Sequence, residues 1–276
     1  MKLGLVQTKH NRMYDFLGAP FTAAPAARTA LQQEQLARNF ALLDSAAGGG
    51  FDLLVTTECI NFLRPVNGDY AACAAGYPPL DSAPVRRLSA AAKAAGSWLV
   101  AGLGCQIEGK AANAALVFDR SGTLRQVYRK LHLAGDEGCT FTPGDAFGVQ
   151  KTEFGTLGVC ICWDMQFPET ARILAGRGAD LIVVPTWGWE GDMYGRARAY
   201  ENGVYVAAAM AVPGWGDITP PRTPSSVVTP QGDYLAMADA AAPGLLTCTL
   251  DPADCAAARA MRLGGRRPAL YGELSV

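Results

Sequence analysis

Short apolar segments rich in β-branched residues alternate along this 276-residue chain with alanine-rich segments of helical periodicity. This alternation constrains the fold most, because strands separated by helices are typical of α/β architectures. We expect strands at 2–7, 51–56, 98–103, 113–119, 124–130, 157–162, 180–184, 204–209, 225–229, 234–237 and 245–250. We expect helices at 31–46, 84–95, 168–176 and 193–202, and loops at 18–30 and 213–224. The economical interpretation is one domain, 1–276, with a C-terminal tail from about residue 252.

The composition excludes several classes of protein. Half of the residues are apolar, so the chain can bury a sizeable core, and 24 basic residues balance 25 acidic ones. A nucleic-acid or membrane-surface partner would favour a basic excess or stripe. The first apolar stretch is too short for a signal peptide, and no apolar run is long enough to span a bilayer. We therefore expect a soluble, cytoplasmic protein, and its eight cysteines are expected to be free thiols in a reducing compartment.

Cys162 is the thiol that carries the most information. It ends the expected strand 157–162, and Pro168 follows as the first residue of the next helix. Ligands in open α/β sheets gather outside the carboxyl ends of strands, so a thiol there faces a crevice. Alternation points Cys160 the same way, but deeper into the layer, where we assign it to packing. The alternative for Cys162 is a buried structural cysteine, because free cysteine is among the most buried residue types.

Two charged residues also stand at the ends of expected strands. Glu58 follows 51–56, where a carboxylate could take a proton from a thiol and later from water. Lys130 ends 124–130, where an ammonium could lower the pKa of a thiol and hold a developing oxyanion. Taken singly, either residue could be an ordinary surface charge.

Together these three positions resemble the nitrilase superfamily of carbon–nitrogen hydrolases. The matching motifs are LLVTTE (53–58), YRKLHL (128–133) and GVCICWDMQFPE (158–169). FTPGD (141–145) and RARAYEN (196–202) support the match, as does the opening strand that ends in Gln7. The order Glu, Lys, Cys is the pattern of that family, and the resemblance extends from the first strand to about residue 251.

The resemblance implies a four-layer α-β-β-α sandwich, with two facing sheets covered on their outer faces by helices. It implies that Cys162 is the nucleophile, Glu58 the general base, and Lys130 with the backbone N–H of Trp163 the oxyanion hole. Glu137 matches a second glutamate of the family, and the resemblance implies that it positions the substrate or supports Lys130 and Glu58. Members commonly pair through helical faces near the nucleophile, so we expect a homodimer or a larger homo-oligomer. No metal or organic cofactor is expected.

Three features depart from the commoner family pattern. The stretch 8–30 is long and rich in alanine and proline, so the first loop is expected to be remodelled. The residues after Arg262 have no clear counterpart. Trp187 and Trp189 follow the strand 180–184 where the family varies with substrate, and alternation would place both on one side if that strand continued. These two tryptophans and His132 are the expected substrate-binding side chains, although both tryptophans could instead cap the core.

The expected reaction is cleavage, through a thioester, of a small amide or N-carbamoyl compound to ammonia and an acid, or an amine plus carbon dioxide. A nitrilase or an acyltransferase of the same superfamily is the alternative. From a different class, a thiol redox or sensor protein could use Cys160 and Cys162, but their spacing is not that of Cys-x-x-Cys motifs. A binding module on an inactive scaffold is disfavoured because every catalytic position is filled. A zinc site is disfavoured because the chain has two histidines and no second cysteine pair at zinc-like spacing.

Overall fold

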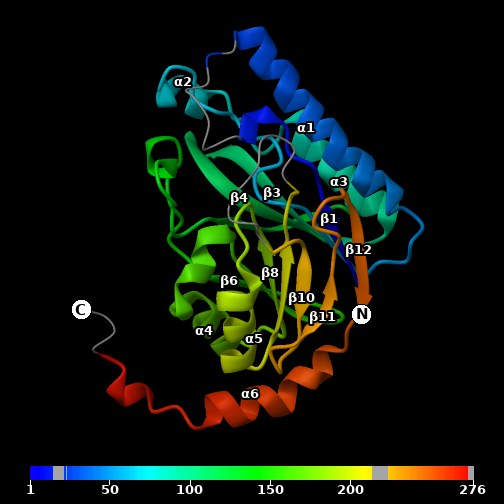
Figure 1. The fold of residues 1–276 in the computed structure, drawn as a ribbon, viewed down its shortest axis with the longest axis vertical. Helices are drawn as coiled ribbons and strands as arrows, with labels where there is room; N and C mark the ends of the chain where they lie inside the picture. Colours follow the sequence, from blue (N-terminus) through cyan, green and yellow to red (C-terminus); the bar gives the residue numbers. More distant parts are fainter. Residues whose placement is uncertain (15–21, 23, 213–222, 273–276) are drawn as a thin grey trace.

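The computed structural model describes residues 1–14, 22, 24–212 and 223–272. The described residues form two six-stranded sheets. Figure 1 shows the arrangement of these sheets and the helices. Among the described residues, no helix combines the length and the apolar character that crossing a membrane requires.

The first sheet has the strand order β12-β1-β2-β3-β4-β5. Its strands are β1 (Lys2–Gln7), β2 (Leu53–Val55), β3 (Trp98–Ile107), β4 (Lys110–Phe118), β5 (Leu124–Arg129) and β12 (Gly244–Thr249). The central strands β1, β2 and β3 run parallel, whereas β12, β4 and β5 pair antiparallel with their neighbours. The last strand of the chain therefore closes one edge of the sheet that the first strand begins.

The second sheet has the order β11-β10-β9-β8-β7-β6 and the same mixed character. Its strands are β6 (Gly148–Thr152), β7 (Gly155–Val159), β8 (Leu181–Pro185), β9 (Tyr205–Ala209), β10 (Ser226–Val228) and β11 (Tyr234–Met237). Strands β7, β8 and β9 run parallel, so their carboxyl ends meet at one edge. The strands β6, β10 and β11 complete the sheet in antiparallel pairings.

Helices cover the outer faces of both sheets. Within the described ranges, the α-helices are α1 (Pro25–Ser45), α2 (Tyr70–Ala75), α3 (Ala83–Ala95), α4 (Pro168–Gly176), α5 (Arg196–Asn202) and α6 (Cys255–Gly264). Leu43 of α1 and Leu88 of α3 pack in one cluster with Leu54, Leu99 and Leu116 of the first sheet. On the second sheet α4 lies close to β7, where a Cβ on Gly158 would come within 3.1 Å of the Leu174 side chain.

The inner faces of the two sheets form a continuous core. Side chains that alternate with those facing α1 and α3, such as Val55, Val100 and Val117, join a cluster with Val159 and Val183 of the second sheet. This alternation is what a strand buried on both faces requires. The architecture is therefore the expected α/β sandwich of two mixed sheets flanked by helices.

Several expected boundaries were wrong. Strand 157–162 ends at Val159, and Cys162 instead begins a 3-10 turn, Cys162–Gln166. Helix 31–46 begins at Pro25, a residue type favoured in the first helical turn, so residues 25–30 of the expected loop 18–30 are helical. The expected helix 193–202 is divided into a π-helical turn, Gly191–Gly195, and α5.

Two short helices were not expected, and parts of two expected loops are not described. The six-residue α2 is too short to show periodicity, and α6 lies in the segment expected to be a tail. Cys255 of α6 is fully buried in the main core, so this segment is packed on the body of the protein. Residues 15–21 and 23 of the expected loops 8–30 and 18–30, and residues 213–222 of the loop 213–224, lie outside the described residues.

Candidate active site

The charged residues expected at strand ends meet between the two sheets. Glu58 follows β2, and Lys130 follows β5, both in the first sheet. Cys162 follows β7 of the second sheet. Because the sheets face each other, residues from distant segments of the chain meet in the space between them. Glu58 and Lys130 are buried, and Cys162 is half-buried.

The backbone around Glu58 lies directly on β3. A Cβ on Gly102 would stand 2.3 Å from the Thr57 carbonyl oxygen and 2.7 Å from the Glu58 Cα, so only glycine permits this approach. The next residue, Cys59, has a φ of 42°, a left-handed conformation that non-glycine residues rarely adopt. The close approach and the turn together direct the Glu58 side chain into the space between the sheets.

Lys130 lies between two carboxylates. Its Nζ is 2.8 Å from Glu58 Oε1 and 2.8 Å from Glu137 Oε2, and it is 1 % exposed. The Asn113 amide of β4 also donates to both, at 2.7 Å to Glu58 Oε1 and 3.3 Å to Glu137 Oε1. Two buried carboxylates next to one another would repel, and one cation and one amide compensate them.

The pKa values of this cluster follow from burial and charge. Burial by itself lowers the pKa of Lys130, but the charges of Glu58, Cys162 and Glu137 raise it above its usual value, so the lysine is a cation. The pKa of Glu137 is raised by burial and by Glu58, against the opposing effect of Lys130. The cluster therefore holds a fixed positive charge beside carboxylates that can accept a proton.

Cys162 is the first residue of its 3-10 turn and has a φ of 44°. Burial and the charge of Glu58 raise the pKa of its thiol to about 11, whereas Lys130, the Thr186 hydroxyl and the Trp187 backbone N–H act to lower it. The thiol is thus protonated at neutral pH and needs a base before it can act as a nucleophile. Glu58 is the carboxylate whose charge acts on it most strongly.

Trp187 fixes the Glu58 segment as well as bordering the cavity. Its backbone N–H donates to Glu58 Oε2 at 3.2 Å, and its indole N–H donates to the Glu58 carbonyl oxygen at 2.7 Å. Its ring packs edge-on against Phe62, with 4.7 Å between centroids. The sequence analysis predicted that this residue lines the pocket, but it did not reveal these two hydrogen bonds.

Trp189 lies elsewhere. It is fully buried in the main core, where its indole N–H donates to Ser226 Oγ at 2.8 Å and its ring packs against Tyr194. Both tryptophans were expected on one side only if the strand continued, and this condition is not met, because β8 ends at Pro185 and strand alternation stops there. Core burial makes Trp189 a packing residue, and it does not line the cavity next to Glu137.

The remaining expected residues take different positions. His132 is not among the cavity-lining residues; its Nδ1 is 2.8 Å from Asp164 Oδ1, and its ring stacks on Phe167. Trp163, the residue after Cys162, has an exposed side chain, whereas Cys160 is buried in the core. The roles of Asn113 and Asp164 went unnoticed in the sequence, where an Asn in a strand and an Asp in a turn carry no distinct signal.

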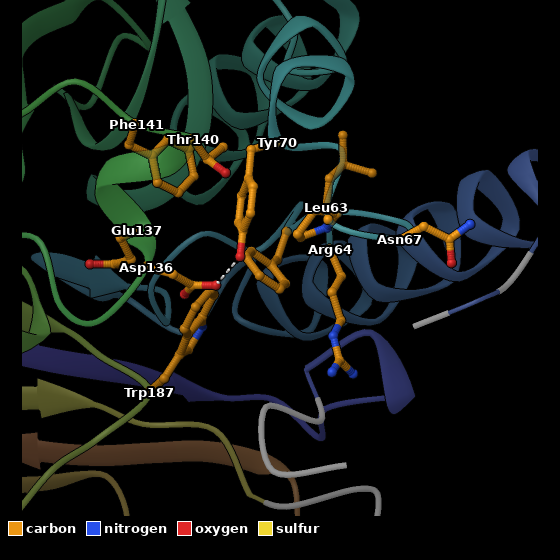
Figure 2. Close-up of a pocket in the computed structure, with 12 residues that line it drawn as sticks. Leu63, Arg64, Asn67, Tyr70, Asp136, Glu137, Thr140, Phe141 and Trp187 are labelled. Atoms are coloured by element: carbon orange, nitrogen blue, oxygen red, sulfur yellow. Dashed lines mark hydrogen bonds between the residues drawn. The ribbon is translucent and has the colours of Figure 1, made fainter. Parts of the chain in front are cut away.

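A cavity of about 540 Å³ opens beside Glu137. Its wall includes the aromatic residues Phe62, Tyr70, Phe141 and Trp187 and the polar residues Arg64, Asn67, Asp136, Glu137 and Thr140. Figure 2 shows the Tyr70 hydroxyl pointing to the Asp136 carboxylate, to which it donates at 2.8 Å. The size is within the range of small-molecule sites, which are mostly apolar with a few placed polar groups.

Within the described ranges, no group of three or more histidine, cysteine, aspartate or glutamate side chains has an arrangement suited to a metal ion. The groups gathered around Cys162 are those of nucleophilic and general acid–base chemistry: a thiol, a carboxylate and a fixed cation.

The chain is similar to several known proteins. The family model described as "Carbon-nitrogen hydrolase" matches residues 5–260. The "Hydrolase in pqqF 5'region" of Pseudomonas protegens is 37 % identical over 236 residues, covering 81 % of each chain. The omega-amidase NIT2 of Homo sapiens is 32 % identical over 235 residues, covering 76 % of this chain and 80 % of that protein.

Solved structures show the same arrangement of elements. A mutant of the amidase from Nesterenkonia sp. AN1 superposes with a TM-score of 0.76 at 26 % identity, covering 99 % of both chains. That structure carries the product of Michael addition of acrylamide at its active-site cysteine. A carbon–nitrogen hydrolase from Helicobacter pylori G27 has a TM-score of 0.80 at 24 % identity, covering 99 % of this chain and 97 % of that one, which supports the fold.

Proposed function

The chain belongs to the carbon–nitrogen hydrolase family, and from this premise we propose that it cleaves small amides or N-carbamoyl compounds with Cys162 as its nucleophile. Its similarity to omega-amidases, and to an amidase modified at its active-site cysteine, makes it a cysteine-dependent amidase acting on carbon–nitrogen bonds other than peptide bonds. One observation supports the assignment of residues: the Lys130 Nζ lies 2.8 Å from a carboxylate oxygen of Glu58 and of Glu137, and Cys162 is half-buried.

In the proposed first half-reaction, Glu58 takes the thiol proton and the Cys162 sulfur attacks the carbonyl carbon of the amide. The carbonyl electrons move to oxygen, and Lys130 and the Trp163 backbone N–H hold that oxyanion. Glu58 then gives its proton to the nitrogen, the carbon–nitrogen bond breaks, and ammonia leaves a thioester behind. The raised pKa of the Cys162 thiol is the reason that this step needs a base.

In the second half-reaction, Glu58 takes a proton from water and the resulting hydroxide attacks the thioester. The tetrahedral species collapses, the proton passes to the departing sulfur, and an acid is released. An N-carbamoyl substrate gives a carbamic acid instead, which breaks down to an amine and carbon dioxide. Glu137 supports the set by accepting a further hydrogen bond from Lys130 Nζ, at 2.9 Å.

The substrate is proposed to be a compact amide whose acyl part enters the cavity beside Trp187. A volume of about 540 Å³ has room for a substituent larger than a methyl group. The omega-amidase relatives favour an amide over a nitrile, although a nitrilase or acyltransferase reaction uses the same residues. We assign the substrate wall to Trp187, and the location of Trp189 and His132 leaves them a supporting part at most.

An ammonia-release screen over amides, ureido acids and nitriles tests the proposal directly. We expect release from at least one amide or ureido compound by the wild-type protein, and none from Cys162→Ala at the same folded fraction. Intact-protein mass spectrometry should detect the acyl group on Cys162, accumulating in Glu58→Gln. Ammonia release from Cys162→Ala at the wild-type rate would remove the nucleophile assignment.

We also propose a homodimer or larger homo-oligomer of this single-domain chain. Apolar side chains are exposed near the nucleophile and on the covering helices, with Trp163 42 %, Tyr200 55 % and Met261 71 % exposed. Exposed apolar side chains on elements that contact one another, as α5 and α6 do, can be covered by a second copy of the chain. Light scattering at micromolar concentration should give at least twice the 29.0 kDa chain mass, and a monomer would contradict the proposal.

A cytoplasmic location is proposed because the eight cysteines are all free thiols, as expected in a reducing compartment. Cell fractionation with thiol trapping should recover the protein in the cytosolic fraction with every cysteine reduced.

A further inference from the structure

Asp164 is a fully buried carboxylate that the proposed mechanism does not use. It lies two residues after Cys162, on the same 3-10 turn. A buried carboxylate is unfavourable unless its oxygens are hydrogen-bonded, so its partners indicate what it is retained for.

Both oxygens of Asp164 are occupied by residues that flank the nucleophile and the lysine. Oδ2 accepts the Tyr128 hydroxyl at 2.7 Å and the Ile161 backbone N–H at 2.9 Å. Oδ1 accepts the His132 backbone N–H at 2.9 Å and contacts His132 Nδ1 at 2.8 Å. Tyr128 and His132 are the residues two positions before and after Lys130, and Ile161 immediately precedes Cys162.

These contacts join segments that belong to different sheets. Lys130 follows β5 of the first sheet, whereas Cys162 follows β7 of the second. Asp164 links these two segments directly, because its carboxylate is hydrogen-bonded to residues on both sides of Lys130 and to the residue before Cys162.

The backbone of Cys162 gives independent support. Its φ of 44° is a strained conformation for a non-glycine residue, and such a conformation persists only where the surroundings determine it. The Asp164 side chain holds the Ile161 N–H, and the Asp164 N–H in turn donates to the Ile161 carbonyl oxygen at 3.0 Å. The turn is thereby closed around the nucleophile from both ends.

We propose that Asp164 is a positioning residue that sets the Cys162 thiol against Lys130, with Tyr128 and His132 as its partners. The inference rests on the proposed roles of Cys162 and Lys130. It predicts that weakening the hydrogen bonds of Asp164 moves the Lys130 ammonium away from the Cys162 sulfur. Lys130 then lowers the pKa of that thiol less than it does in the intact protein. It also predicts a loss in kcat with little change in KM, because the cavity that binds the substrate is lined by other residues.

The test compares Asp164→Asn and Tyr128→Phe with a matched control, Tyr205→Phe. Tyr205 is a buried tyrosine of β9 whose hydroxyl donates to Asp254 Oδ2 at 2.7 Å, the same kind of bond at a place outside the site. We expect kcat to fall about 100-fold in Asp164→Asn, the loss that a misplacement of about 1 Å can cause. Tyr128→Phe should lose about 10-fold, as for one hydrogen bond to a charged group, and Tyr205→Phe should keep wild-type activity.

A second readout does not depend on turnover. The rate at which iodoacetamide labels Cys162, followed by peptide mass spectrometry, reports the thiolate fraction at each pH. Its midpoint should rise in Asp164→Asn and in Tyr128→Phe and stay unchanged in Tyr205→Phe. This separates the inference from the proposed function: if no amide is hydrolysed at all, the labelling profile still measures whether Asp164 sets the thiol.

Wild-type kcat and an unshifted labelling midpoint in both folded variants would overturn the proposal. So would losses that track the folded fraction alone and appear equally in Tyr205→Phe, since that is the behaviour of a merely structural bond. If Asp164→Asn does not fold, Tyr128→Phe decides the matter, because phenylalanine keeps the ring and removes only the hydroxyl.

Discussion

The floor of the site and the rim of its cavity are built in opposite ways. We call three residues the floor of the proposed site: Glu58, Asn113 and Lys130. Their exposed fractions are 0 to 1 %, and the side chains of Asn113 and Lys130 both donate hydrogen bonds to Glu58. In the cavity rim Arg64 and Tyr70 are half-buried, and Asp136 is exposed at the cavity mouth (Figure 2). Buried charges are stable only with their partners in place, whereas solvated groups tolerate change. We therefore expect the proposed reaction to depend on the strand ends and the choice of substrate to depend on the loops around the cavity.

The largest effect should come from the thiol itself. Cys162→Ala is expected to abolish ammonia release while the protein stays folded, because no other nucleophile faces Glu58 and Lys130 in the proposed mechanism. Cys160→Ala is the matched control, two residues away and buried in the core, and it should keep most of the activity. Equal loss in both variants at equal folded fractions would point to the wrong sulfur.

The second largest effect is expected when the cation of the floor, Lys130, is removed. Lys130→Ala removes the proposed oxyanion donor, a change worth about 2.7–4 kcal/mol in the barrier. It also leaves two buried carboxylates without their cation, a loss of about 3–5 kcal/mol in the free energy of unfolding. Lys151→Ala on the exposed edge strand β6 serves as control, and kcat with urea denaturation measures both effects. A mild Lys130→Ala phenotype would show that the floor is less rigid than its contacts indicate.

Glu58→Gln should separate turnover from thiol acidity. The charge of Glu58 raises the pKa of Cys162, which is about 11, so removing it should lower that pKa and increase the thiolate fraction at any pH below it. Iodoacetamide labelling of Cys162 at pH 8 to 9 should thus become faster, while hydrolysis slows because the base is lost. Slower labelling in this variant, or turnover at the wild-type rate, would contradict the assigned base.

The two tryptophans sharpen the comparison within one loop. Trp189→Ala empties a core position and should cost about 3–5 kcal/mol of stability with the ranking of substrates unchanged. Trp187→Ala should change the preferred acyl group and lower kcat by about 10-fold, because Glu58 loses the indole hydrogen bond. Thermal unfolding and a panel of amides measure the two outcomes. If both variants lose stability and activity equally toward every amide, Trp187 belongs to the core as well.

The smallest effects are expected at the rim. Tyr70→Phe removes one hydrogen bond at the cavity mouth, and Asp136→Asn removes the charge of its acceptor. Stability should change by no more than about 0.5 kcal/mol in either variant. KM should shift by a few-fold, in a direction that depends on the acyl group, with kcat nearly constant. A large loss of kcat in either variant would mean that the rim takes part in the chemistry and that the contrast with the floor does not hold.

Much of the fold was predictable because its signals are local. The alternation of apolar runs with alanine-rich segments located most strands and the helices α3 and α4 close to their observed bounds. The start of α1 was missed because its first turn has no strong apolar pattern, and the split at Gly191–Gly195 was missed because a π-helical turn has no distinct sequence pattern. Strand 157–162 was overextended because the apolar run continues past the last ladder hydrogen bond.

What the sequence by itself determined is the set of candidate reactive residues: Glu58, Lys130 and Cys162 each follow a recognisable strand in an order that resembles one family. What only the tertiary structure decided is their partners. Asn113 donates hydrogen bonds to the carboxylates of Glu58 and Glu137. Asp164 joins the segment that contains Cys162 to the segment that contains Lys130. Trp187 lies at the cavity, whereas Trp189 lies in the main core. The physical reason is distance along the chain. Periodicity reports which face of its own element a residue occupies, but a hydrogen bond such as that between Trp187 and Glu58, 129 residues apart, exists only once the two sheets have packed.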